Sequence, residues 1–227
     1  QGGRQERQQA RTLTDALDYA SRFYQAALKG QQGEFARDYL KQRGLDDSII
    51  EQYQLGYAPG TGTALFDSAS KDLQGPLVET GTVSDKYGRP RDLFRNRVMF
   101  PIADARGRVI AFGGRALSAD AKAKYLNSPE TPLFHKGRVL YNLNRARKPA
   151  HDEGTVIAVE GYMDVVGLAQ GGIMNAVAPL GTALTEDQIQ LLWRMSPEPV
   201  LCFDGDKAGL RAAYRAVERV LPLLKPG

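Results

Sequence analysis

Two carboxylates stand one residue apart in the segment CFDGDKAG, residues 202–209, directly after an apolar run. Like charges this close repel each other, so crowding Asp204 and Asp206 calls for a positive charge between them. A divalent cation with oxygen ligands is the natural candidate. Asp and Gly are also common where a strand passes into a helix, so this octet alone fits either a turn or a metal site.

The surrounding pattern predicts the place of this segment in a sheet. Over the last third of the chain, three apolar runs alternate with three helix-like segments: runs at 155–159, 174–179 and 199–203, helices at 162–170, 185–195 and 207–224. Continuous apolar strands that alternate with helices indicate a parallel sheet covered on both faces, which is an α/β architecture.

A third acid, Glu160, ends the first apolar run, and Asp204 ends the third. Sites in open parallel sheets form at the carboxyl ends of strands. If the first and third strands are neighbours, with the second on the outer side, Glu160, Asp204 and Asp206 converge on one edge. Mg²⁺ suits such a cluster, because it binds a few carboxylate oxygens and fills its other positions with water or phosphate. The pattern therefore favours the metal site over the turn.

The charge of the chain is unevenly distributed. Residues 81–150 hold 15 of the 30 Lys and Arg residues but only 5 of the 26 Asp and Glu residues. Within this block, two β-rich runs flank Asp104–Gly107 and predict a hairpin that carries several arginines. A basic block beside an acidic end suggests a polyanion held next to a metal, and solvated surface charge is the alternative.

The first third of the chain is expected to be helical. Residues 12–29 carry apolar side chains at helical spacing, and shorter helices are expected at about 33–43 and after Asp46. Residues 1–11 are polar and rich in glutamine, and we expect a tail or a linker there.

Composition limits the class of protein. The one cysteine, Cys202, excludes a disulfide within the chain and a cysteine-based zinc site, and favours a reducing cytoplasm. No apolar run approaches the length that spans a bilayer. We expect Met163, Trp193 and Cys202 to pack in the core, and His135 and His151 to be structural or on the surface.

Longer motifs carry a specific resemblance. VEGYMDVVGLAQGGI, APLGTALTEDQIQLL and CFDGDKAGLRAA resemble the Toprim domain of bacterial DnaG-type primases. RVMFPIADARGRVIAFGGR and KYLNSPETPLFHKGRVLYNL are similar to the basic N-terminal subdomain of the same family's RNA polymerase core. The resemblance implies residues 12–135 as the basic mixed α+β subdomain and 136–227 as an α/β Toprim subdomain with a parallel sheet, truncated at its C-terminus.

The resemblance also implies roles for individual residues. Glu160, Asp204 and Asp206 become catalytic, metal-binding acids, and Asp164 becomes a supporting catalytic acid. A second set is implied to contact the template or the nucleotide: Arg97, Arg115, Lys124, Tyr125, Asn127 and Lys136.

The activity implied is synthesis of short RNA primers on single-stranded DNA by metal-dependent nucleotidyl transfer. Mg²⁺ is the implied cofactor, Mn²⁺ can substitute, and zinc is expected only in a separate N-terminal module that this chain lacks. Implied partners are the single-stranded DNA template, NTPs and the RNA–DNA hybrid, and, through regions outside this chain, the replicative helicase and single-strand-binding protein.

We expect a monomer, without membrane contact, in the bacterial cytoplasm at the replication fork. Whether these residues are active alone is left open. Two alternatives also remain: another Toprim protein, such as a topoisomerase or nuclease, or a DNA-binding module without catalysis.

Overall fold

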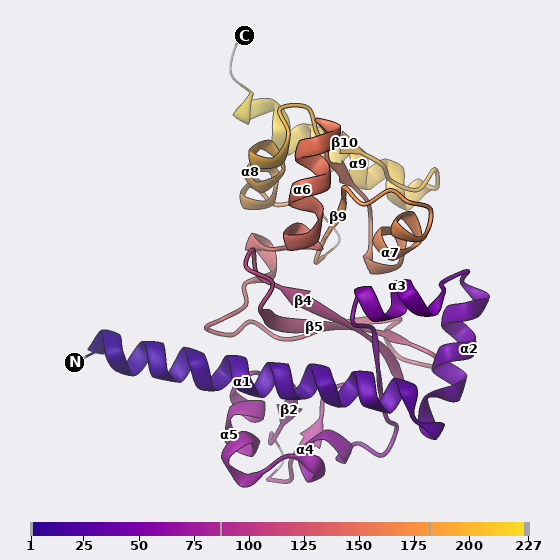
Figure 1. The fold of residues 1–227 in the computed structure, drawn as a ribbon. Helices are drawn as coiled ribbons and strands as arrows, with labels where there is room; N and C mark the ends of the chain where they lie inside the picture. The colour runs from indigo at the N-terminus through magenta and orange to yellow at the C-terminus, as the bar shows by residue number, and fades with distance from the viewer. Residues whose placement is uncertain (1, 87, 182, 225–227) are drawn as a thin grey trace. The chain divides into compact units, whose positions relative to one another are not determined.

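The computed structural model describes residues 2–86, 88–181 and 183–224, and its helices and strands divide between two units (Figure 1). The first unit comprises the described residues up to 103 together with 108–134. The second comprises 104–107 and the described residues from 135 onward. Within these ranges, no helix is both long and apolar enough to cross a membrane.

The first unit contains a four-stranded antiparallel sheet in the order β1-β4-β5-β6. Its strands are β1 Gly56–Ala58, β4 Arg97–Ala103, β5 Val109–Ala116 and β6 Tyr125–Asn127, and a separate pair is formed by β2 Val83–Ser84 and β3 Arg91–Asp92. Its helices are α1 Gly2–Lys29, η1 Gln31–Gly33, α2 Glu34–Gln42, α3 Asp47–Gln52, α4 Ala64–Ser68 and α5 Lys71–Glu79. The predicted hairpin around 104–107 is confirmed by the pairing of β4 with β5.

The long helix α1 confirms the helix predicted at 12–29 but begins earlier, at Gly2. Residues 2–11, where we expect a tail or a linker, are thus helical, and their role as a tail or linker stays a prediction. Gln, Arg, Glu and Ala, which dominate this stretch, are all good helix formers, so a polar sequence here continues the helix.

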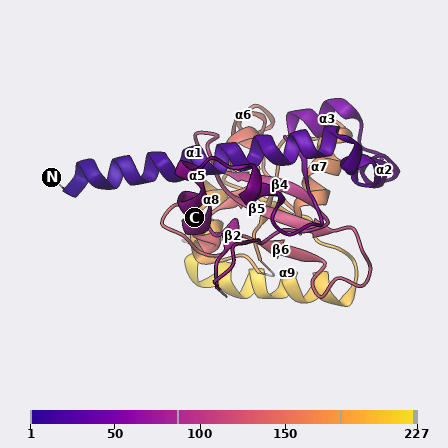
Figure 2. The same cartoon turned by 90° about the horizontal axis from the view of Figure 1, so that it is seen from below.

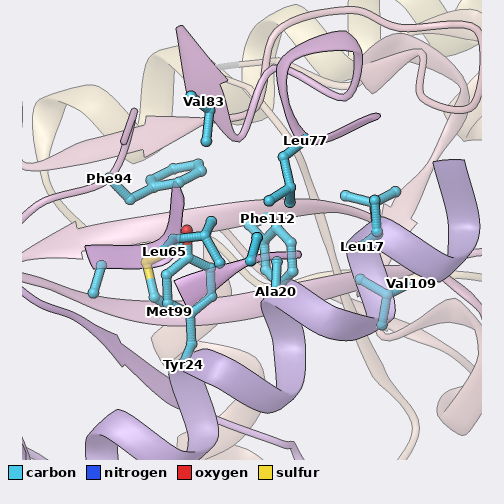
Figure 3. Packing of buried hydrophobic residues seen from close by; sticks show 13 residues of the cluster. Leu17, Ala20, Tyr24, Leu65, Leu77, Val83, Phe94, Met99, Val109 and Phe112 are labelled. Carbon is cyan, nitrogen blue, oxygen red and sulfur yellow. The ribbon is translucent and has the colours of Figure 1, made fainter. Parts of the chain in front are cut away.

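Helix α1 lies along one face of the sheet, in contact with β1 and β5 (Figures 1 and 2). Its apolar stripe, including Leu17, Ala20 and Tyr24, packs against Met99 of β4 and Phe112 of β5 (Figure 3). The Tyr24 and Phe112 rings meet edge to face, with centroids 5.3 Å apart. This cluster fixes which face of β4 and β5 is covered, and leaves the other face of each strand for other contacts.

The second unit contains a four-stranded sheet in the order β10-β8-β9-β7. Its strands are β7 Leu140–Tyr141, β8 Ile157–Ala158, β9 Ala176–Pro179 and β10 Val200–Leu201. Its helices are η2 Lys136–Arg138, α6 Leu143–Glu153, α7 Tyr162–Gln170, α8 Glu186–Met195, α9 Lys207–Val220 and η3 Leu221–Leu223.

The neighbour relation assumed from the sequence is confirmed in this sheet: β8 lies between β10 and β9 and is parallel to both. Helix α8 begins with a capping box, in which the side chains of Thr185 and Gln188 each accept from the other's backbone N–H group. Strand β7 was not predicted, and it pairs antiparallel with β9. The sheet is therefore mixed, with one short antiparallel edge strand, and the predicted α/β class holds.

Candidate functional site

Two of the predicted acids meet at the carboxyl ends of neighbouring strands. Glu160 follows β8 and Asp204 follows β10, and the parallel register pairs Ala158 with Leu201 just before them. The backbone N–H of Asp204 donates to Glu160 Oε1 at 2.9 Å. This bond fixes one oxygen of Glu160 at the edge of the sheet and leaves its second oxygen, Oε2, for another ligand.

A glycine makes this approach possible. A Cβ atom at Gly209, in the first turn of α9, would lie 2.1 Å from the carbonyl oxygen of Asp204 and 2.7 Å from Glu160 Oε1. Atoms cannot approach that closely, so only glycine fits here. The GDKAG part of the motif thus lets α9 begin directly against the acidic edge.

Asp206 is the N-cap of α9. Its Oδ1 accepts from the backbone N–H groups of Ala208 and Gly209, each at 2.8 Å. These hydrogen bonds, that of Gly209 first, lower the pKa of Asp206 below its ordinary value, so the exposed carboxylate is ionised at neutral pH. In the structure Asp206 caps α9, as the interpretation of the motif as a turn predicts. Its carboxylate also keeps the negative charge that a metal ligand needs.

The carboxylate of Asp164 stabilises the turn that follows β8. Its Oδ2 accepts from the backbone N–H of Gly161 at 2.9 Å, at the start of α7. Asp164 also lines a cavity of about 350 Å³ together with Glu160 and Asp204. The remaining lining residues are Val159, Met163, Gly167, Leu168, Cys202 and Phe203.

The donor chemistry of this edge fits Mg²⁺, because the side chains are carboxylates that bond backbone N–H groups through one oxygen each. Within the part of the chain that the structure describes, no three His, Cys, Asp or Glu side chains are arranged around one metal position. Asp206, which bonds the α9 backbone, is not among the residues that line the cavity with Glu160 and Asp204. The structure thus brings two of the three predicted ligands together.

Two of the residues expected in the core, Met163 and Cys202, line this cavity. Cys202 is exposed and lines the cavity beside Asp204, so the expectation that it packs in the core is wrong. It follows the short edge strand β10, and its backbone N–H still donates to the carbonyl of Ala158 in β8. Trp193 does pack against the apolar cluster of this unit.

A second group of predicted residues lies on one face of the sheet in the first unit. The register pairs Arg115 of β5 with Tyr125 of β6, and Gly113 with Asn127. Paired residues of antiparallel strands project to the same side, and residues two apart along a strand do so as well. Arg115, Tyr125 and Asn127 therefore share the face opposite the one that packs on α1.

Arg97 lies on the other face, because its register partner is Ala116 rather than Arg115. Its side chain is buried, and burial lowers the pKa of Arg97 from its ordinary value. The guanidinium donates to three backbone carbonyls, those of Gly114, Ala123 and Lys124. The structure therefore places the Arg97 side chain on the face opposite Arg115, Tyr125 and Asn127, although it bonds the backbone carbonyl of Lys124.

Two lysines complete the predicted set. Lys124 precedes β6 and is exposed, with its ammonium 5.9 Å from the centre of the Tyr125 ring. Lys136 is also exposed but belongs to the second unit, in η2, where its carbonyl accepts from Gln188. The basic residues are thus divided between the two units.

The sequence pattern did not single out Tyr39 and Arg43, because it predicted only a short helix at about 33–43. The Arg115 guanidinium lies over the Tyr39 ring, with its carbon 4.3 Å from the ring centre. Arg43 lies 5.6 Å from the same ring centre, and its Nε donates to the Tyr39 hydroxyl at 3.0 Å. A Tyr and an Arg four residues apart, at the end of a helix in a basic chain, are the signal that could have found them.

Comparison with known proteins identifies both parts of the chain. Residues 23–147 match the family of the DNA primase catalytic core, N-terminal domain, and residues 154–226 match the Toprim domain. A primase match and a Toprim match on one chain favour a primase over the topoisomerase, nuclease and DNA-binding alternatives.

Similar sequences agree with this family assignment. The chain is 50% identical over 224 residues to a DNA primase of Pseudomonas aeruginosa, and covers 33% of that protein. It is 48% identical over 226 residues to a DNA primase of Escherichia coli K12, and covers 39% of it. The chain thus spans about a third of the length of these relatives.

Solved structures extend the likeness to the fold. A DnaG primase catalytic domain bound to single-stranded DNA superposes with a TM-score of 0.88 at 44% identity, over 96% of this chain and 69% of that one. A DNA primase domain from Pseudomonas aeruginosa gives a TM-score of 0.88 at 48% identity, over 94% and 68% of the two chains.

Proposed function

Because the chain belongs to the family of bacterial DnaG-type DNA primases, we propose that it is part of the catalytic core of an enzyme that makes short RNA primers on single-stranded DNA. The observation that carries the proposal is the meeting of Glu160 and Asp204 at the ends of β8 and β10, in one cavity. We assign residues 12–135 to the basic subdomain and 136–227 to the Toprim subdomain.

In the proposed reaction, the 3′-hydroxyl of the growing RNA attacks the α-phosphate of an incoming NTP, and pyrophosphate leaves. Glu160 and Asp204 hold the acidic edge, with Asp206 at the start of α9 as the third ligand. The lowered pKa of Asp206 keeps its negative charge available at neutral pH. Asp164 supports the site by fixing the turn that follows Glu160.

Mg²⁺, or Mn²⁺ in its place, would be held by Glu160, Asp204 and Asp206, and would supply the positive charge that activates the hydroxyl and neutralises the phosphates. No protein side chain is assigned as general base. The carboxylates contribute by binding and by orientation, and Gly209 by leaving room for them.

The template and nucleotide are bound by the strand face of the first unit. Arg115 offers a forked contact to phosphate, and Tyr125 offers a ring on which a base stacks. Lys124 and Asn127 add charge and hydrogen bonds to this face, and Lys136 is assigned the same role from the second unit. A related primase domain binds single-stranded DNA in its solved structure, which supports this assignment for the present chain.

The wider setting follows from the same family. The enzyme acts in the bacterial cytoplasm at the replication fork, on NTPs and an RNA–DNA hybrid. We propose that the replicative helicase and the single-strand-binding protein engage parts of the full-length protein beyond these residues.

The test is RNA synthesis from labelled NTPs on single-stranded DNA with Mg²⁺ or Mn²⁺, using the full-length protein and its Asp204→Asn variant. Asp204→Asn should abolish synthesis and leave single-stranded DNA binding nearly unchanged, because the acidic edge and the basic strand face belong to different units of the chain. Glu198→Gln, which removes an exposed carboxylate outside the cavity in the same unit, is the matched control and should synthesise normally.

Normal synthesis by Asp204→Asn would refute the role of the acidic edge. Metal-dependent cleavage of the DNA, without RNA synthesis by the wild-type protein, would instead favour the nuclease reading.

A further inference from the structure

The side chain of Arg97 bridges two segments of the first unit. Its Nη1 donates to the carbonyl oxygens of Gly114 at 3.1 Å and Lys124 at 3.3 Å, and its Nη2 donates to that of Ala123 at 2.9 Å. Only 9% of the residue is exposed. A guanidinium that is buried and bonded to three carbonyls is poorly placed to contact a phosphate in solution.

The three carbonyls mark the place where a loop returns to the sheet. Gly114 lies within β5, whereas Ala123 and Lys124 end the loop that connects β5 to β6. The backbone N–H of Ala116 also donates to the Lys124 carbonyl, at 2.8 Å. A planar fork of donors can bridge such a set, whereas the point charge of a lysine cannot match it.

The sheet is shaped to admit this side chain. A Cβ atom at position 114 would lie 2.8 Å from Phe94 Cδ1 and 3.0 Å from Arg97 Cδ. Glycine at 114 therefore leaves the space through which the stem of Arg97 passes. The second glycine of the segment FGGR has this packing reason, separate from any contact with a ligand.

We propose that Arg97 is a positioning residue for template binding: its guanidinium fixes the end of the β5–β6 loop, so that Lys124 and Tyr125 are held ready without Arg97 touching nucleic acid. The proposal rests on the proposed function for the roles of Lys124 and Tyr125. It replaces the direct contact that the resemblance implied for Arg97.

The test combines binding with loop dynamics in the full-length protein. Arg97→Met keeps a long buried side chain without donors, and Arg97→Lys keeps the charge without the fork. Both should bind a single-stranded oligonucleotide about tenfold more weakly, the loss expected when one stacking contact fails. In a Lys124→Ala/Tyr125→Ala background, Arg97→Met should cause no further loss, because the groups it positions are gone.

Hydrogen exchange supplies the readout that general destabilisation would not reproduce. Amides of residues 117–124 should exchange faster in Arg97→Met and Arg97→Lys, with exchange in α1 unchanged. Arg95→Met, which alters an exposed arginine two residues away, is the matched control and should leave the loop as in the wild type.

The proposal is overturned if Arg97→Met weakens oligonucleotide binding as much in the Lys124→Ala/Tyr125→Ala background as in the wild type. It is also overturned if Arg97→Lys binds as tightly as the wild type. Either result would show that Arg97 contacts a phosphate directly. Faster exchange throughout α1 as well would make it a general stabilising residue and also overturn it. If the wild-type protein binds no single-stranded DNA, the proposed function fails. The loop measurement still stands in that case, and unchanged loop exchange in Arg97→Met overturns the positioning role.

Discussion

At the scale of single residues, the acidic edge depends as much on a glycine, Gly209, as on the carboxylates themselves. Glu160 Oε1 reaches the backbone N–H of Asp204 only because Gly209 has no Cβ. The position needs glycine for space alone, since its backbone has no positive φ. Alanine there must push apart the two strand ends that carry the carboxylates.

Gly209→Ala should therefore lower the free energy of unfolding by about 1–3 kcal/mol, the usual cost of overpacking, and should abolish primer synthesis. Gly167→Ala is the control, because a Cβ in that helix meets no heavy atom within 4 Å. It should raise stability by roughly 0.5–1 kcal/mol. Thermal and urea unfolding check both values, and a Gly209→Ala protein with wild-type stability would contradict the packing argument.

The uncharged side chain of Tyr39 contributes to the strand face through its contact with the charged side chain of Arg115. Its ring lies against the Arg115 guanidinium, at a distance where the ring quadrupole attracts the cation. The ring thereby holds Arg115 at the strand face assigned to the template.

Tyr39→Leu should weaken single-stranded DNA binding about two- to fivefold, matching the 0.5–1 kcal/mol of an exposed cation–π contact. Tyr39→Phe keeps the ring and loses only the hydroxyl bonded to Arg43, so its effect should be smaller. The salt dependence of binding should be the same in both variants and the wild type, since no cation is removed. Equal losses in the two variants would show that the hydroxyl, rather than the ring, matters.

At the scale of elements, a buried carboxylate joins β3 to α4. Asp92 is 4% exposed, and its two oxygens accept from the backbone N–H groups of Leu65 and Phe66, in the first turn of α4. Thr63, the N-cap residue, makes no side-chain capping bond, so Asp92 supplies that function from a distant strand. Burial raises the pKa of Asp92 above its ordinary value, although the two N–H groups oppose the shift.

The raised pKa means that the folded protein binds the Asp92 proton more tightly than the unfolded chain does. Its contribution to stability is therefore present at low pH and is lost as the pH rises through the folded pKa. The unfolding free energy of the wild type, minus that of Asp92→Asn, should fall as the pH is raised from about 4 towards 7. Urea unfolding of both proteins across this range checks the sign, and a difference that grows with pH would refute it.

The helices and strands also show which parts of the fold and of the candidate site could be predicted from the sequence. Glu160 and Asp204 were predictable, because alternating strands and helices place both at one sheet edge, and only the strand order had to be assumed. Strand β7 was not predictable from a two-residue run in an irregular segment. The face of Arg97 was hidden as well, since β4 is buried at every position and its sequence shows no alternation.

At the scale of the whole molecule, the excess of positive charge over residues 81–150 is the property most easily tested. Three of the residues assigned to nucleic acid are cations, namely Arg115, Lys124 and Lys136. Each phosphate neutralised on a single strand contributes about −0.7 to the slope of log affinity against log salt, so the three together predict a slope of about −2.

Titrating a short single-stranded oligonucleotide between about 50 and 200 mM NaCl measures this slope. Replacing Lys124 by alanine should make it shallower by about 0.7, whereas Tyr39→Leu should not change it. A slope near zero for the wild type would mean that these cations are only solvated surface charge.

The exposed position of Cys202 makes the acidic edge directly observable. It is the only cysteine in the sequence and lines the cavity with Glu160 and Asp204. In these 227 residues a maleimide fluorophore would therefore attach at one defined place without any engineered residue. Its emission would report the arrival of divalent ions and nucleotides, and fragments tethered through the same sulfur could be screened as inhibitors.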